Sequence, residues 1–259
     1  SGRDHRLAIA TLRSDLELLE EHAQGYAGPL KYSVAGPWTL AATMERPRGD
    51  RVLADHGARR DLAQSLAEGV AELLVDMRRR LPETQPLVQL DEPLLPALLA
   101  GSVPTASGFS RHRAVDAPEV STALRQLVER VQATAGSDAL VHCCAADPPI
   151  QVLYGAGARG VLVDLDRLGR TEWDAIGAAL EADLRVGLGA WPTDRTLTTD
   201  EVARRVLSGL RDLGMDPSRS AQLILTPACG LASATPAGAV SALRALRTAA
   251  DIVTDQLAS

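Results

Sequence analysis

ALVHCCAADPPIQVLYGAGARGVLVD, residues 139–164, contains two apolar segments separated by a stretch with a different pattern. We predict strands over residues 139–143 and 160–164, joined by a short helix over about residues 148–154. A strand, a helix and a second strand in this order predict a right-handed βαβ unit with two parallel strands. Both strands are apolar at nearly every position, which is typical of a sheet covered on both faces.

The same alternation extends through the rest of the chain. Further strands are predicted over residues 30–35, 86–91, 184–188 and 222–226. Further helices are predicted over residues 3–23, 57–80, 117–134, 171–182, 199–213 and 236–257. Six repeats of strand and helix predict an α/β fold, either a barrel or a doubly wound parallel sheet.

Composition narrows the class of protein. The 259 residues are 46% hydrophobic and 23% charged, which excludes a disordered chain and a disulfide scaffold. A net charge of −6 and an aromatic content of 3% argue against nucleic-acid binding. No apolar run approaches the roughly 20 residues of a membrane span. Three cysteines, two of them adjacent, favour a reducing cytoplasm over a disulfide framework.

Four of the predicted strands have polar residues at their carboxyl ends or shortly after them. Asp91 and Glu92 end the second strand, His142, Cys143 and Cys144 the third, and Asp164 the fourth, and Cys229 follows the sixth. The carboxyl ends of parallel strands share one rim, so residues distant in sequence converge there. Because side chains alternate along a strand, His142 and Cys144 share a face, and Cys143 points toward the helix layer.

One imidazole, one carboxylate and two thiolates are ligands suited to tetrahedral zinc. His142, Cys144, Asp164 and Cys229 therefore form a candidate zinc site. The alternative is that the cysteines are small buried hydrophobic residues and His142 is a hydrogen-bonded core residue.

Two other motifs have competing interpretations. Asp91-Glu92-Pro93 is either a site for a substrate amine or an acidic helix N-terminus. Residues 155–160, GAGARG, match the G-x-G-x-x-G pattern of dinucleotide-binding proteins, but they precede a strand where that pattern follows one. We therefore interpret residues 155–160 as a helix-to-strand turn in which glycine supplies positive φ.

At these residues the chain resembles the catalytic barrel of cobalamin-independent methionine synthase. The matching segments, in family order, are 35–40 (AGPWTL), 89–93 (QLDEP), 142–144 (HCC), 161–164 (VLVD) and 227–231 (PACGL). The resemblance implies a zinc centre of His142, Cys144, Asp164 and Cys229, with Asp164 where the family has Glu. It also implies that Asp91, beside Glu92, holds the amino group of homocysteine, whose zinc-bound thiolate attacks a methyl group.

The resemblance is weaker on the side of the methyl donor. Thr43 stands where the family has a tryptophan under the folate pterin, and Ala97 where it has an acidic folate contact. Pro192 aligns with the proton-donating histidine, so no catalytic residue is assigned. Trp38 and Trp191 are candidates for another aromatic surface. We therefore expect a methyl donor other than folate, such as a methyl-corrinoid protein.

The resemblance implies a TIM (β/α)8-type barrel. The family barrel has two strands before the first one predicted here, so this chain is expected to hold strands 3 to 8 of one catalytic-barrel domain, residues 1–259, partial at its N-terminus with the first two strands missing. The expected activity is that of a cytoplasmic S-methyltransferase similar to 5-methyltetrahydropteroyltriglutamate–homocysteine methyltransferase. The alternatives are a degenerate barrel that binds zinc or a thiol without turnover, and a metal-free barrel like uroporphyrinogen decarboxylase.

Overall fold

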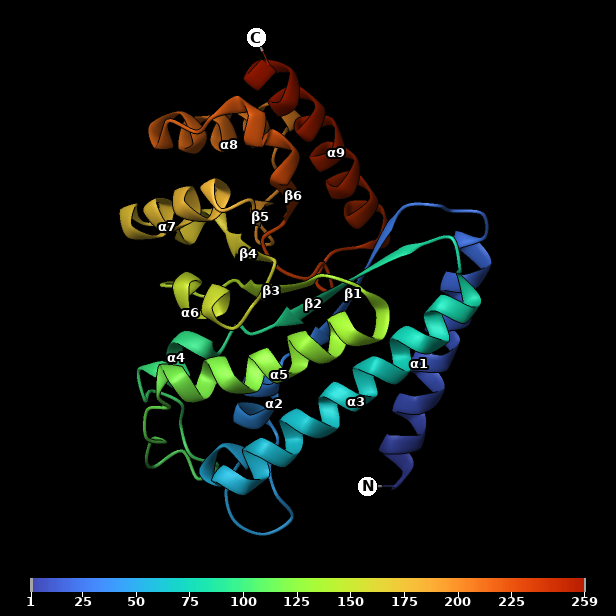
Figure 1. Cartoon of the computed structure of the whole chain (residues 1–259), viewed down its shortest axis with the longest axis vertical. Helices are drawn as coiled ribbons and strands as arrows, with labels where there is room; N and C mark the ends of the chain where they lie inside the picture. Colours follow the sequence, from blue (N-terminus) through green and yellow to red (C-terminus); the bar gives the residue numbers. More distant parts are fainter. Residues whose placement is uncertain (1, 259) are drawn as a thin grey trace.

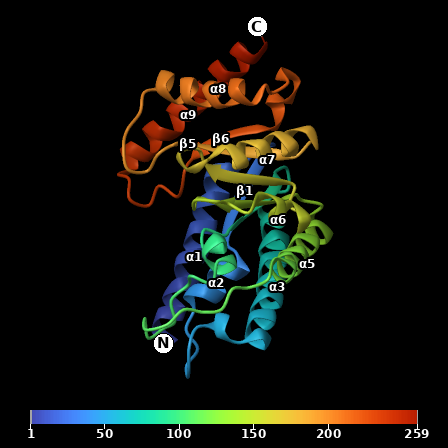
Figure 2. The same ribbon diagram turned by 90° about the vertical axis from the view of Figure 1, so that its left-hand side faces the viewer.

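The computed structural model describes residues 2–258, in which six parallel strands form one sheet. The strands are β1 (Pro29–Ala35), β2 (Gln85–Asp91), β3 (Ala139–Cys143), β4 (Gly160–Asp164), β5 (Arg185–Trp191) and β6 (Leu223–Pro227). Their order in the sheet is their order in the sequence. A doubly wound sheet would reverse its strand order at a switch point, so the barrel alternative is the one that fits. The sheet curls into a half-barrel (Figures 1 and 2), consistent with part of a TIM barrel.

The connecting helices follow one another along the convex side of the sheet (Figure 1). The helices are α1 (Gly2–Ala23), α2 (Pro37–Thr43), α3 (His56–Arg80), α4 (Leu95–Leu99), α5 (Ala117–Ala135), α6 (Ile150–Gly155), α7 (Arg170–Glu181), α8 (Thr199–Leu213) and α9 (Pro236–Ala258). Contacts run from α3 to α5, and then through α6, α7 and α8 to α9. None of the helices in the described part of the chain has the length and apolar character needed to cross a membrane.

Short elements lie where the sequence predicted loops. Helix α2 follows β1 directly, α4 follows β2, and 3₁₀ turns form over Val52–Ala54, Leu165–Arg167 and Pro217–Gln222. Segments of three to seven residues are too short to show a helical period, so hydrophobic patterning does not detect them. Strand β5 also continues to Trp191, beyond the predicted end at residue 188.

Local signals in the sequence fix several element ends. Thr198 and Glu201 form the reciprocal cap of α8: the Thr198 Oγ1 accepts from the Glu201 backbone N–H at 3.3 Å, and the Glu201 carboxylate accepts from the Thr198 N–H at 2.7 Å. Residues 155–160 form the predicted turn between α6 and β4, in which Gly157 has φ +87°. This conformation favours glycine because it has no Cβ.

The two faces of the sheet differ in environment. The convex face packs into the core with the helices, through residues that include Val88, Leu90, Val141, Val161, Val163, Val186 and Leu188. Strand β3 is buried at every position, as expected, but β1 alternates and exposes Lys31, Ser33 and Ala35. The expectation of a sheet covered on both faces is therefore wrong at β1, where one face lies open on the concave side. Polar side chains of the neighbouring strands share that concave side.

Candidate metal centre

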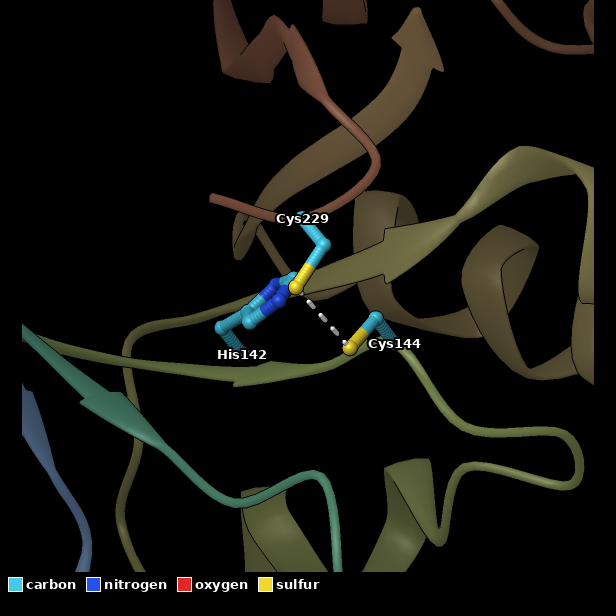
Figure 3. A group of neighbouring side chains, drawn as sticks. All are labelled: His142, Cys144 and Cys229. Atoms are coloured by element: carbon cyan, nitrogen blue, oxygen red, sulfur yellow. Dashed lines mark hydrogen bonds between the residues drawn. The ribbon is translucent and has the colours of Figure 1, made fainter. Parts of the chain in front are cut away.

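His142, Cys144 and Cys229 come together at the carboxyl end of the sheet (Figure 3). One ligand atom from each lies within 4.8 Å of the others, and the two Sγ atoms are 3.6 Å apart. His142 lies on β3, Cys144 follows that strand immediately, and Cys229 lies two residues beyond β6. One nitrogen and two sulfur atoms gathered in this way can hold a metal ion that prefers soft ligands.

The strand alternation separates Cys143 from this group. Cys143 is fully buried, and burial raises the pKa of its thiol to about 11. Cys143 pairs in register with Val163, on the face of the sheet opposite to His142, and it is not among the three clustered donors, so it is a packing residue of the core. The two adjacent cysteines therefore have different environments.

The protonation of the remaining donors follows from their surroundings. Burial lowers the pKa of His142, with Asp91 opposing the shift, so the neutral imidazole that a metal requires is favoured. Burial, followed by the neighbouring Cys229 thiol, raises the pKa of Cys144 to about 12. His142 is 7% exposed, whereas Cys229 is exposed to solvent, so the group lies at the edge of an opening.

Close backbone packing brings Cys229 to the rim. The Ala228 backbone N–H donates to the Trp191 carbonyl at 2.8 Å, which ties the segment after β6 to the end of β5. A Cβ added to Gly189 would lie 2.6 Å from the Ala228 Cα and 2.8 Å from the Val163 carbonyl oxygen. The absence of a side chain at Gly189 is thus what allows β4, β5 and the Cys229 segment to approach this closely.

Asp164, the fourth ligand expected from the sequence, is not among these three clustered donors. It ends β4, and its carboxylate accepts from the Asp166 backbone N–H at 3.0 Å and lies 3.3 Å from the Arg167 Nε. Asp164 nevertheless lines the same cavity of about 420 Å³ as Cys144 and Cys229. In this structure its carboxylate caps the turn that follows β4.

Asp91 and Glu92 are adjacent but differ in environment. Asp91 pairs in register with His142, which places both side chains on the concave face. Glu92 is fully buried, and its carboxylate accepts from the backbone N–H groups of Trp38 (2.9 Å) and Thr39 (2.7 Å) and from the Thr39 hydroxyl (2.8 Å). Glu92 therefore serves the N-terminus of α2, and only Asp91 faces the side of the metal group.

Burial also determines the charge state of Glu92. Desolvation raises the pKa of its carboxyl group to about 7, although the three hydrogen bonds from α2 act in the opposite direction. Asp91 adds a smaller upward shift, because two neighbouring negative charges repel. Glu92 is thus a carboxyl group whose ionisation is linked to the packing of α2 against the sheet.

The positions at which the resemblance implies a difference from the family pattern have different surroundings. Pro192, which the resemblance aligns with the family histidine, lines the cavity beside Cys144 and Cys229. Thr43 ends α2, and its hydroxyl donates to the Thr39 carbonyl. Trp38 and Trp191 are 2% and 6% exposed, so neither presents an open ring face for stacking.

Lys31 is a polar residue at the site that none of the sequence motifs includes. It is the only lysine in the chain and lies on β1, where its Nζ donates to the Gln89 Oε1 at 2.5 Å. A signal was present in the sequence: Lys31 and Ser33 alternate with Tyr32 and Val34, which marks one polar face of a strand. The alternation predicts that this face of the strand is polar, but it does not predict which groups the side chains contact.

The fold and the site together define a class: a curled parallel α/β barrel with an imidazole and two thiols converging at the carboxyl ends of its strands. Residues 30–252 match the model of the family described as cobalamin-independent synthase, catalytic domain. The chain belongs to this family, and the resemblance to cobalamin-independent methionine synthase is confirmed. No curated protein sequence matches the chain. The family match favours methionine-synthase-type chemistry over the uroporphyrinogen-decarboxylase-like alternative.

Proposed function

We propose that the protein is a zinc-dependent S-methyltransferase that transfers a methyl group to homocysteine or a similar thiol. The observation that carries this proposal is the group of His142, Cys144 and Cys229 in a chain of the cobalamin-independent synthase family. Ligand atoms around one tetrahedral zinc ion lie about 3.3–3.8 Å apart, given zinc–ligand distances near 2.0–2.3 Å. The 3.6 Å between the two Sγ atoms fits that spacing.

Each residue of the site has a proposed role. His142, Cys144 and Cys229 would hold the zinc, and Asp164, which lines the same cavity, is the proposed fourth protein ligand. Bound zinc would keep a coordinated substrate thiol in its thiolate form at neutral pH. Asp91, on the same face as His142, would bind the substrate ammonium group. Glu92, directly after β2, holds the N-terminus of α2 against the sheet and has no exposed surface for a ligand.

The reaction forms one bond and breaks one. The substrate sulfur attacks the methyl carbon, and the electron pair of the breaking bond stays with the donor. Thr43, Ala97 and Pro192 replace three folate-side residues of the family pattern, which supports a donor other than methylfolate. We propose a methylated corrinoid, presented by a partner protein, as that donor, and we assign no residue as proton donor.

We propose further that residues 1–259 form one catalytic-barrel domain located in the cytoplasm. By the order of the family motifs, β1–β6 correspond to the third to eighth strands of the barrel. A second candidate function, zinc or thiol binding without turnover, is favoured by one observation, the proline at position 192.

Metal analysis and a donor panel test these proposals. We expect one zinc per chain, and methionine formation from L-homocysteine with methylcobalamin or a methylated corrinoid protein but not with methylfolate. The Cys144→Ser variant is the inactive control. Absence of stoichiometric zinc overturns the zinc-dependent function. Binding of zinc and homocysteine without methionine from any donor identifies a binding protein instead of an enzyme.

A further inference from the structure

Three side chains on the concave face form a continuous hydrogen-bonded line from β1 to the proposed substrate site. The Lys31 Nζ donates to the Gln89 Oε1 at 2.5 Å, and the Gln89 Nε2 donates to the Asp91 Oδ1 at 2.6 Å. The register pairs Ser33 with Gln89 and Ala35 with Asp91, so Lys31 and both partners face the same side of the sheet. Lys31 also donates to the Ser33 Oγ at 3.2 Å, which anchors the ammonium group to its own strand.

The donors and acceptors of each group fix the direction of the hydrogen bonds along this line. An ammonium group can only donate hydrogen bonds, so Gln89 must turn its amide oxygen toward Lys31. The amide NH₂ of Gln89 then faces Asp91, whose carboxylate can only accept. Without the lysine, the Gln89 amide would lose one of the two hydrogen bonds that fix its position, and its hold on the Asp91 carboxylate would loosen.

The charges along the line are consistent with this role. Desolvation lowers the pKa of Lys31, and the negative charge of Asp91 opposes that shift. His142 responds to both charges, because Asp91 raises its pKa and Lys31 lowers it. Lys31, Asp91 and His142 therefore form one electrostatic unit that links β1 to the metal group.

We propose that Lys31 is a positioning residue for the substrate amino group. Through Gln89 it holds the Asp91 carboxylate with Oδ1 occupied, and the contact with the substrate ammonium falls to Oδ2. Lys31 itself does not touch the substrate. This inference rests on the proposed function, in which Asp91 binds the amino group of homocysteine.

Two ligands that differ in a single group test the inference. L-Homocysteine carries the α-amino group, and γ-mercaptobutyrate is the same thiol acid without it. In zinc-loaded protein, Lys31→Met should weaken binding of L-homocysteine about tenfold, as expected for a displaced charge-assisted hydrogen bond. Binding of γ-mercaptobutyrate should stay within about twofold of wild type, because Asp91 has no amino group to meet. Lys31→Arg, which keeps a cationic donor, should restore part of the lost affinity.

The coupling to Gln89 provides a matched control. Gln89→Met has a similar length but cannot relay the hydrogen bond, so it should reproduce the effect of Lys31→Met. The double variant should be no weaker than Gln89→Met alone, because both changes break the same line. A ligand-free readout is the NMR signal of the Gln89 side-chain NH₂, which should shift in Lys31→Met. Thermal melts of each variant are the check that the fold is retained.

The outcomes separate this inference from the proposed function. If Asp91→Asn weakens L-homocysteine binding but Lys31→Met does not, the inference is overturned and the proposed function stands. An equal loss of affinity for both ligands in Lys31→Met also overturns the inference, because that result indicates a general structural effect. If wild-type protein binds no L-homocysteine, the proposed function fails together with the substrate role of Lys31. A shifted Gln89 signal would then still show that Lys31 orients the amide next to Asp91.

Discussion

The Sγ atoms of Cys144 and Cys229 lie 3.6 Å apart, although 85 residues separate them in the sequence. Cys144 follows β3 and Cys229 follows β6, and β4 and β5 lie between these strands. In a flat sheet, strands three places apart would be about 14 Å apart, at about 4.8 Å per strand. The curl of the sheet and the segment after β6 therefore close the distance. The metal group depends on the curvature of the barrel.

Removal of either thiol should abolish metal binding. We expect wild-type protein to carry one zinc ion, and Cys144→Ser and Cys229→Ser to lose it, because a hydroxyl is a poor substitute for a thiolate ligand. Metal analysis after dialysis against a weak chelator measures the content. Cys143→Ala is the matched control, since this neighbouring cysteine is buried outside the group. Loss of zinc in Cys143→Ala, or its retention in Cys144→Ser, would contradict the assignment.

Zinc affinity should rise with pH. Cysteine binds the metal as thiolate, and burial holds Cys144 as a thiol by raising its pKa to about 12 in the metal-free protein. Release of the Cys144 proton on metal binding makes binding at least about tenfold tighter per pH unit. His142 should add nothing above its ordinary pKa, because burial keeps it neutral. Chelator competition between about pH 6 and pH 8 measures the slope. An affinity independent of pH would show that Cys144 is not a ligand.

Glu92 should make stability depend on pH. The pKa of its carboxyl group is about 7 in the folded protein against 4.5 as the ordinary value, so between these pH values the folded state holds a proton that the unfolded state has released. The free energy of unfolding should therefore fall as pH rises from 4.5 to 7. The contribution is about 3 kcal/mol, at about 1.4 kcal/mol per pKa unit.

Urea unfolding at several pH values isolates this contribution of Glu92. Glu92→Gln cannot ionise, so its free energy of unfolding should fall less steeply across the same pH window. Glu72→Gln, which changes an exposed glutamate on α3, should keep the wild-type slope. Identical slopes for wild type and Glu92→Gln would refute the raised pKa.

Gly189→Ala should damage both the fold and the metal group. The added methyl would press on the Ala228 Cα at 2.6 Å and on the Val163 carbonyl, and backbone cannot move aside as a flexible side chain can. We expect a loss of about 1–3 kcal/mol in stability together with weaker zinc binding, because the Cys229 segment is displaced. Gly69→Ala is the control: no atom outside its own helix lies within 4 Å of its Cβ, and the change should stabilise α3 by about 0.5–1 kcal/mol. Unchanged zinc affinity in Gly189→Ala would show that this contact does not position Cys229.

Local patterning determined much of the site. The apolar strands ending in polar residues placed Asp91, His142, Cys144 and Asp164 at one rim, and strand alternation separated Cys143 from its neighbours. These are properties of a few consecutive residues, so they can be deduced without knowing what packs against them. The parallel sheet and the family resemblance followed from the same segments.

The tertiary structure alone decided which polar groups meet. It placed Cys229 beside Cys144, and it used the Asp164 carboxylate in the turn after β4. It also placed the Glu92 carboxylate at the N-terminus of α2 and linked Lys31 to Asp91 through Gln89. Each of these outcomes depends on sheet curvature and on contacts between segments distant in sequence. The alternation of side chains along a strand predicts the face of the sheet on which each residue lies. The atoms that its side chain contacts depend on how all six strands and their helices pack.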